Sequence, residues 1–201
     1  MPHHPPPLIV PEDPGTETIK SRVLRVFDGD GFLAHLDVPN AGTAVEVPVR
    51  LGFIDAPETE QPGGPEAKAF LTQLIGGATL DLAILLKMDT GRAFDRHRRI
   101  VAVPYLAQEY AAIDCWNTAQ TRHRIHRFGP PQRITRNIEL EMVINGWAWV
   151  LDRYGPDERY TLALQDARHH RRGIWASDHN IPPWEFKRQK YRRAQEPIPL
   201  L

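Results

Sequence analysis

The chain has 201 residues, with 25 Lys or Arg against 25 Asp or Glu, so its formal net charge is zero. Its single cysteine, Cys115, excludes an intrachain disulfide, and no run of 18 apolar residues is present that could span a membrane. The charge is unevenly spread. Residues 1–90 hold 6 Lys or Arg and 13 Asp or Glu, a net charge of −7, whereas residues 91–201 hold 19 and 12, a net charge of +7. Such a chain can bind a cation in one place and a polyanion in another, unless the two halves intermix on folding.

The N-terminal residues 1–18 predict a flexible, extended lead-in, because six of the first 14 residues are proline. They lack the apolar stretch after a basic start that marks a secretory signal, so we expect a cytoplasmic protein. A secreted protein is the alternative if the N-terminus was trimmed. One domain is expected over residues 19–188, followed by a C-terminal tail over residues 189–201.

The elements follow from apolar periodicity and turn signals along the chain. Five strands are predicted, at residues 19–27, 32–38, 43–54, 78–88 and, after a turn, within 95–106. Three helices are predicted, at residues 64–77, 137–146 and 156–172. Most of the strands are linked as hairpins, with one helix inserted and two following. This order predicts an α+β fold with a five-stranded antiparallel barrel and three helices, as in the OB architecture, which often binds nucleic acid.

Acidic residues gather at two chain reversals. Asp28 and Asp30 frame the DGDG turn, and Asp55 and Glu58 follow the end of the third predicted strand. Hard cations such as Ca²⁺ prefer several oxygen ligands, which carboxylates and backbone carbonyls provide. The spacing is not that of an EF-hand, since Pro39 occupies the twelfth position, and a DGDG sequence alone is more typical of a hairpin turn. Any cation would therefore need ligands from distant parts of the chain.

Arginines lie on or beside two predicted strands. In residues 43–54 the apolar side chains alternate, so Arg50 points to the opposite face. The segment DRHRR places Arg96, Arg98 and Arg99 just before another strand. A guanidinium matches a phosphate with two parallel hydrogen bonds, so these arginines indicate phosphate binding. The alternative, that they only cover a solvated face, stays open for Arg96 and Arg98.

In chain order, the segments RVFDGDGF, VRLGFIDAPETEQ, DRHRRIVA, GWAWV, RRGIW and IPPWEF resemble the landmarks of the staphylococcal nuclease (thermonuclease) family. The resemblance covers about residues 20–188 apart from one insertion, and the RLxxIDAPE block is its most specific part. It implies an OB-type barrel with three helices. It also implies Ca²⁺-dependent hydrolysis of phosphodiester bonds in DNA and RNA, with little sequence specificity and with 3′-phosphate products.

The resemblance also implies roles, residue by residue. Arg50 and Arg99 match the arginines that clamp the scissile phosphate, and Glu58 matches the glutamate that orients or deprotonates the attacking water. The implied metal ligands are all oxygen donors: Asp30, Asp55 and the backbone carbonyl of Ala56. Asp28 would support them from the same turn. The cation would neutralise a phosphate oxygen, and the arginines would stabilise the charge on five-coordinate phosphorus.

The chain departs from the family pattern at several positions near the implied site. Gly31 replaces a threonine, His97 replaces a tyrosine near the substrate, and Arg98 replaces a turn glycine. Of two tyrosines that flank the bound nucleotide in the family, Tyr154 has a match and the other position is Asp152. We expect His97 and Tyr154 to contact the substrate. The departures bear on nucleotide preference more than on the reaction.

Residues 107–136 form an insertion relative to the family's core. It contains no acid between Asp114 and Glu139, and its arginines are Arg122, Arg124, Arg127, Arg133 and Arg136. We predict that Arg122, Arg124 and Arg127 contact the nucleic-acid backbone while aromatic side chains stack on bases. A solvated basic loop is the alternative. A zinc site at Cys115, His123 and His126 is disfavoured, because the spacing fits no common site and lacks a fourth ligand.

The sequence therefore predicts a nuclease that acts as a monomer on DNA, RNA or both, with single strands preferred and no membrane partner. A non-catalytic nucleic-acid-binding module is the alternative, and a partner-binding protein that uses Trp184 and Phe186 is a third possibility. The presence of the complete set of implied acids and arginines favours the enzyme.

Overall fold

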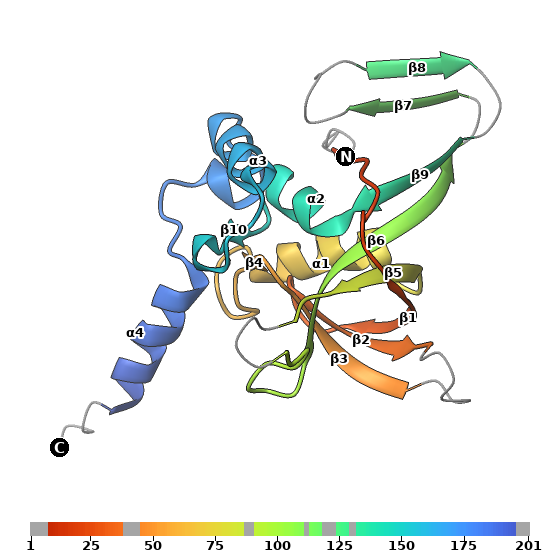
Figure 1. The fold of residues 1–201 in the computed structure, drawn as a ribbon. Coiled ribbons are helices and arrows are strands. Elements are labelled where there is room, and N and C mark those ends of the chain that lie inside the picture. The colour runs from red at the N-terminus through yellow and green to blue at the C-terminus, as the bar shows by residue number, and fades with distance from the viewer. Residues whose placement is uncertain are drawn as a thin grey trace.

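The computed structural model describes residues 8–37, 45–86, 91–110, 113–117, 124–128 and 132–195, with 110, 113–117, 124–128, 132 and 193–195 described by their backbone alone (Figure 1). A closed barrel forms its centre. The strands follow the order β3-β2-β1-β5-β6, and a parallel pairing of β3 with β6 closes the ring. Their bounds are β1 Ile19–Val26, β2 Gly31–Leu36, β3 Val45–Leu51, β5 Thr79–Ile84 and β6 Ile100–Tyr110. The predicted five-stranded barrel is thus confirmed, although its closing pair is parallel.

Helices and short strands pack around one end of the barrel. The helices are α1 Gly64–Ile75, α2 Ile138–Ile144, α3 Glu158–His169 and α4 Pro183–Gln195. The short elements are β4 Ile54–Asp55, β10 Trp149–Val150 and the 3₁₀ turns η1 Asp152–Tyr154 and η2 Gly173–Ala176. The α+β class and the first three helices agree with the sequence analysis. No helix in the described part of the chain is long and apolar enough to cross a membrane.

Helix α4 was not expected from the sequence, which placed a domain boundary at residue 188 within it. Charged and amide side chains predominate in it, so only a few apolar residues could mark it as a helix. Figure 1 shows α4 reaching away from the barrel beside β4 and β10. The helix therefore belongs to the structure beside the predicted site rather than to a separate tail.

The core lies between the inner face of the barrel and helices α1 and α2. Every residue of α2 is buried, and the helix lies between α1 and α3 (Figure 1). On β3, Val49 and Leu51 are fully buried, whereas Val45 is exposed. The difference arises because β3 pairs with β6 only from Val49 to Leu51, beyond Pro48, which has no N–H to donate. The core-facing half of β3 is thus the half that carries Arg50.

Residues 8–12 of the N-terminal segment pack against the domain, whereas the flexibility predicted for residues 1–18 stays a prediction. Asn137 N donates to the carbonyl of Val10 at 2.9 Å, and Glu12 N donates to Thr135 O at 2.9 Å. Val10 is buried in the core cluster. A short apolar run between prolines can extend along a sheet edge, because proline favours extended backbone and the run gains apolar burial.

The insertion extends the sheet and adds a hairpin. Strand β6 continues past the predicted end and pairs with β9, Gln132–Asn137. Strands β7, Ile113–Asn117, and β8, Arg124–Phe128, pair with each other beyond the outer ends of β6 and β9 (Figure 1). The 11 residues of β6 span up to about 33 Å, at roughly 3.3 Å per residue. The hairpin therefore leaves the barrel at the end of β6 opposite to Arg99.

A buried ion pair joins β9 to α2. Arg136 Nε donates to Glu141 Oε1 at 2.7 Å, a second bond joins Arg136 Nη2 to Glu141 Oε2, and Val10 N donates to Glu141 Oε1 at 3.0 Å. Burial raises the pKa of Glu141 above its ordinary value, although Arg136 opposes this. One side-chain pair thus ties the N-terminal segment, β9 and α2 together.

We predict that Arg136→Met lowers the free energy of unfolding by about 3–5 kcal/mol, because it leaves the Glu141 carboxylate buried without its partner. The matched control is Lys20→Met, since Lys20 forms an exposed ion pair with Asp81 at 2.6 Å. The control should cost less than about 1 kcal/mol. Urea unfolding of both variants measures the difference. Equal losses would contradict the assigned role of the buried pair.

Candidate active site

The turn between β1 and β2 carries Asp30 into the site because Gly29 allows a very close approach. A Cβ atom on Gly29 would lie 2.5 Å from the Cβ of Ala56 and 2.9 Å from the Cβ of Ala67. The turn therefore packs directly on the segment after β4 and on α1. Asp28 Oδ1 accepts from Asp30 N at 3.1 Å, which holds the turn from within. This packing brings Asp30 beside Asp55.

Arg50 lies between the two buried aspartates. Its Nη2 is 3.4 Å from Asp30 Oδ2 and 3.3 Å from Asp55 Oδ1, and its Nη1 donates to Leu51 O at 3.1 Å. Ala56 N donates to Asp30 Oδ2 at 3.3 Å. The strand alternation predicted that Arg50 would point away from the core, and in the structure it points to these acids. Four of the predicted site residues thus meet at the end of β3.

The acids of this cluster repel one another. Burial, followed by the charge of Asp30, raises the pKa of Asp55 to about 7, against the opposing charges of Lys187 and Arg50. Burial, followed by the charge of Asp30, raises the pKa of Asp28 to about 6. Burial alone would lower the pKa of Arg50, but Asp30 and Asp55 raise it above its ordinary value. The cluster is therefore an environment that favours added positive charge.

The donor chemistry fits a hard cation. Asp30 and Asp55 present carboxylate oxygens side by side, and neither sulfur nor imidazole lies among the implied ligands. Within the described ranges, no group of three or more His, Cys, Asp or Glu side chains is arranged to hold a metal. A cation at this pair would thus take its other ligands from carbonyls, such as that of Ala56, and from water.

Glu58 stands at the exposed edge of the cluster. Its Oε1 is 2.7 Å from Lys187 Nζ, which is also 3.7 Å from Asp55 Oδ1. Glu58 N donates to Gln61 Oε1 at 3.2 Å, which fixes the turn after β4. With its side chain 39% exposed, Glu58 lies where a carboxylate can contact both solvent and the buried acids. Lys187 was not singled out by the sequence analysis, because it lies on the unexpected α4.

Arg99 immediately precedes β6, the strand that pairs with the Arg50 segment of β3. The parallel register pairs Val49 with Ile100 and Arg50 with Val101, so Arg99 lies beside Pro48, two positions before Arg50 along the pair. Asp95 accepts from Arg99 N at 3.0 Å and from Arg99 Nε at 2.9 Å, and it lies 2.8 Å from Nη2. Burial would raise the pKa of Asp95, but these bonds hold it below its ordinary value. Asp95 thus orients the Arg99 guanidinium by one edge.

The same turn accommodates Arg98, which adopts a left-handed φ of 62°. Asp95 Oδ1 accepts from His97 N at 2.8 Å, and Arg98 N donates to Asp95 O at 3.1 Å. The arginine that replaces a turn glycine therefore keeps a tight turn at the cost of some backbone strain. His97 is exposed on this turn, with its Nε2 3.0 Å from Arg96 Nε.

The remaining predicted substrate contacts are distributed over the molecule. Tyr154 is exposed on η1 under the Arg153 guanidinium. Arg124 and Arg127 lie on β8, of which the backbone alone is described, and Arg122 lies outside the described residues. The substrate contacts of His97, Tyr154 and the three insertion arginines stay predictions.

A sequence profile described as "Staphylococcal nuclease homologue" matches residues 48–177. The chain belongs to this family. The matched range contains Arg50, Asp55, Glu58 and Arg99, whereas Asp30 lies before it and α4 after it. The site at the end of β3 is therefore built partly from the family's matched region and partly from segments on either side of it.

Several relatives in the family align with most of the chain. Protein ParB from Escherichia coli is 28% identical over 192 residues, covering 94% of this chain and 90% of that protein. An uncharacterized endonuclease from Haemophilus influenzae is 30% identical over 169 residues, covering 84% and 73%. A micrococcal nuclease from Shigella flexneri is 28% identical over 178 residues, covering 87% and 84%. The chain is thus similar along most of its length to proteins named as nucleases.

The sequence analysis missed Glu139, which supports the family site from α2. Glu139 is fully buried and accepts from Tyr160 Oη at 2.9 Å, from Phe53 N at 3.4 Å and from Gly52 N. These bonds hold the bend between β3 and β4, and hence the relative directions of Arg50 and Asp55. The signal in the sequence is the pair of glutamates inside the apolar stretch NIELEMVI.

We predict that Glu139 makes stability fall as pH rises. Burial raises its pKa from 4.5 to about 7, against the opposing bonds from Tyr160 and the backbone. Between these two values the folded state holds a proton that the unfolded chain has released. The unfolding equilibrium constant should therefore rise by up to about tenfold per pH unit in this window.

The variant Glu139→Gln has no carboxyl group to titrate at this position. Urea unfolding across the window should show the variant gaining stability relative to the wild type as pH rises, with exposed Glu66→Gln as the control. A constant difference between Glu139→Gln and the wild type over the same pH range would show that the carboxyl is ionised throughout.

Proposed function

We propose that the protein is a Ca²⁺-dependent nuclease that hydrolyses phosphodiester bonds of DNA and RNA with little sequence specificity and leaves 3′-phosphates. The observation that carries this proposal is the Arg50 guanidinium between buried Asp30 and Asp55, with Glu58 at the exposed edge. Family membership and the nuclease names of the relatives support a phosphodiester substrate. We also propose that single strands are preferred and that the protein acts as a monomer.

Each residue has a role that its position supports. Arg50 and Arg99 present guanidinium groups from neighbouring strands, where both can bind the oxygens of one phosphate. Asp95 engages the Nε and Nη2 edge of Arg99, so the opposite edge of the fork can face the substrate. Ca²⁺, when bound by Asp30 and Asp55, would supply positive charge to a phosphate oxygen and order a water molecule.

Glu58 then accepts the proton of the attacking water as its oxygen bonds to phosphorus. The bond from phosphorus to the 5′-oxygen breaks, and that oxygen takes a proton from solvent, which leaves the phosphate on the 3′ side. Arg50 and Arg99 stabilise the extra negative charge on the five-coordinate phosphorus. The Lys187 ammonium must leave Glu58 or shift along it during this step, because it lies 2.7 Å from the accepting carboxylate.

The direct test is cleavage of single-stranded DNA and of RNA by the wild-type protein, with Ca²⁺ and then with excess chelator. We predict cleavage with Ca²⁺, loss of cleavage with chelator, and 3′-phosphate ends by mass spectrometry. Arg99→Gln should lower kcat by about a hundredfold or more, because it removes a charge partner of the transition state.

The matched control is Arg98→Gly, which removes a guanidinium from the same turn at a φ of 62° that glycine readily adopts. It should cleave at a rate close to that of the wild type. Cleavage by folded Arg99→Gln at the wild-type rate would reject the phosphate clamp. Binding of nucleic acid without any cleavage would instead identify a non-catalytic binding module.

We further propose that the insertion binds the substrate backbone far from the reacting phosphate. The position of the β7–β8 hairpin beyond the outer end of β6 supports this (Figure 1). Only a long nucleic-acid substrate could reach both the hairpin and the site beside Arg99 at the other end of β6. The triple variant Arg122→Gln, Arg124→Gln and Arg127→Gln should bind long oligonucleotides more weakly. Its salt dependence should flatten by about 0.7–0.9 in the log–log slope for each lost phosphate contact.

Cleavage of a dinucleotide is the internal control for the insertion. It should be unchanged in the triple variant, because a substrate of that size cannot span β6. Wild-type affinity for long oligonucleotides at two salt concentrations would show that the hairpin does not contact nucleic acid.

A further inference from the structure

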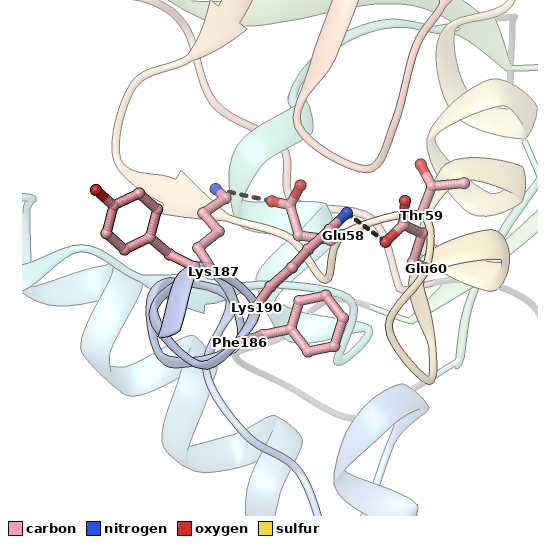
Figure 2. Close-up of a pocket in the computed structure, with 7 residues that line it drawn as sticks. Glu58, Thr59, Glu60, Phe186, Lys187 and Lys190 are labelled. Atoms are coloured by element: carbon pink, nitrogen blue, oxygen red, sulfur yellow. Dashed lines mark hydrogen bonds and ion pairs between the residues drawn. The ribbon is translucent and has the colours of Figure 1, made fainter. Parts of the chain in front are cut away.

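Helix α4 is attached to the segment that carries Glu58. Lys187 Nζ lies 2.7 Å from Glu58 Oε1, and Lys190 Nζ lies 2.6 Å from Glu60 Oε2 (Figure 2). Buried Gln61 donates from Nε2 to Ile181 O, just before the helix begins. The helix is thereby held beside the cluster of acids, although it lies beyond the range matched by the family profile.

A groove of about 530 Å³ runs between α4 and residues Glu58–Glu60. Phe186 and Tyr191 supply aromatic surface to it, and Tyr191 is 67% exposed. This volume suits a single small ligand group such as a nucleotide. An exposed aromatic ring beside a phosphate-binding centre offers a face on which a base can stack.

The charge of α4 suits a polyanion. Pro183–Gln195 contains one acidic residue, Glu185, and five basic residues, Lys187, Arg188, Lys190, Arg192 and Arg193. Lys187, Lys190 and Tyr191 are three and four positions apart, so they share one face of the helix. The pairs that Lys187 and Lys190 form with Glu58 and Glu60 are exposed, and exposed ion pairs contribute little stability. A phosphate can therefore replace the carboxylates at small cost.

We propose that the groove between α4 and Glu58–Glu60 is a subsite for the nucleotide adjacent to the scissile phosphodiester. Tyr191 stacks on its base, and Lys187 and Lys190 bind the flanking phosphate. The subsite rests on the proposed nuclease function for its place in the reaction, but its binding can be measured without cleavage. The partner is a single strand of nucleic acid, because a base within a duplex has no face available for stacking.

The test is binding of a short single-stranded DNA oligonucleotide by fluorescence anisotropy in the presence of chelator, so that metal-dependent cleavage does not occur. Tyr191→Ala should weaken binding by about 5- to 100-fold, as loss of one base–aromatic stack does, and Tyr191→Phe should restore it. Lys190→Gln should flatten the salt dependence of binding by about 0.7 in the log–log slope.

The matched control is Lys20→Gln. Lys20 has a similarly exposed side chain and a carboxylate partner at a similar distance, but it lies on β1. Its binding and salt slope should match those of the wild type. Wild-type affinity in Tyr191→Ala would overturn the subsite.

Two further outcomes distinguish the subsite from the proposed nuclease function and from an inhibitory role of α4. If the wild-type protein binds the oligonucleotide but cleaves nothing, and Tyr191→Ala binds it more weakly than the wild type does, the subsite is upheld and the nuclease function is rejected. Faster cleavage by Lys187→Gln, with oligonucleotide affinity unchanged in Tyr191→Ala and Lys190→Gln, would overturn the subsite and identify α4 as an inhibitory latch on Glu58.

Discussion

The contact of the Arg50 guanidinium with Asp30 and Asp55 is the constraint on which the site depends. The two aspartates come from different segments, one from the β1–β2 turn and one from β4, and both are buried. Without the guanidinium, two like charges would lie side by side away from solvent, at a cost that few packing contacts could offset. Because Arg50 is on the strand that leads into Asp55, one short segment supplies both the positive charge of Arg50 and one of its two carboxylate partners.

The barrel turns this local contact into a site. Closure of β3 against β6 brings the Asp95–Arg99 turn alongside Arg50, and Glu139 holds the bend that directs Asp55. Gly29 allows the first turn to press against Ala56. These supports are far apart in sequence, so the site forms only when the barrel is closed. The acidic first half and the basic second half of the chain do not separate, since they meet where Lys187 contacts Asp55 and Glu58.

Much of this arrangement could be predicted from short-range patterns. Alternation along 43–54 predicted the side of the strand on which Arg50 lies, and the DGDG turn and the order of the family motifs predicted its acidic neighbours. The apolar stretch around Glu139 marks it as a buried acid, but its role could not be inferred from short-range patterns, because two of its partners are backbone N–H groups 86 and 87 positions away. Lys187 was not predicted because α4 is rich in charged side chains and has few apolar ones. The packing of Leu8–Val10 was not predicted because three apolar residues among prolines show no period.

Calorimetric titration of Ca²⁺ into the wild-type protein and into Asp55→Asn tests most directly whether the acids around Arg50 form a cation site. We expect saturable binding of one Ca²⁺ per chain by the wild type and binding weaker by at least about tenfold in the variant, as loss of a ligand or of its support produces. Exposed Glu46→Gln on β3 is the control and should bind as the wild type does. Absence of saturable binding in the wild type, or equal binding in Asp55→Asn, would contradict the account.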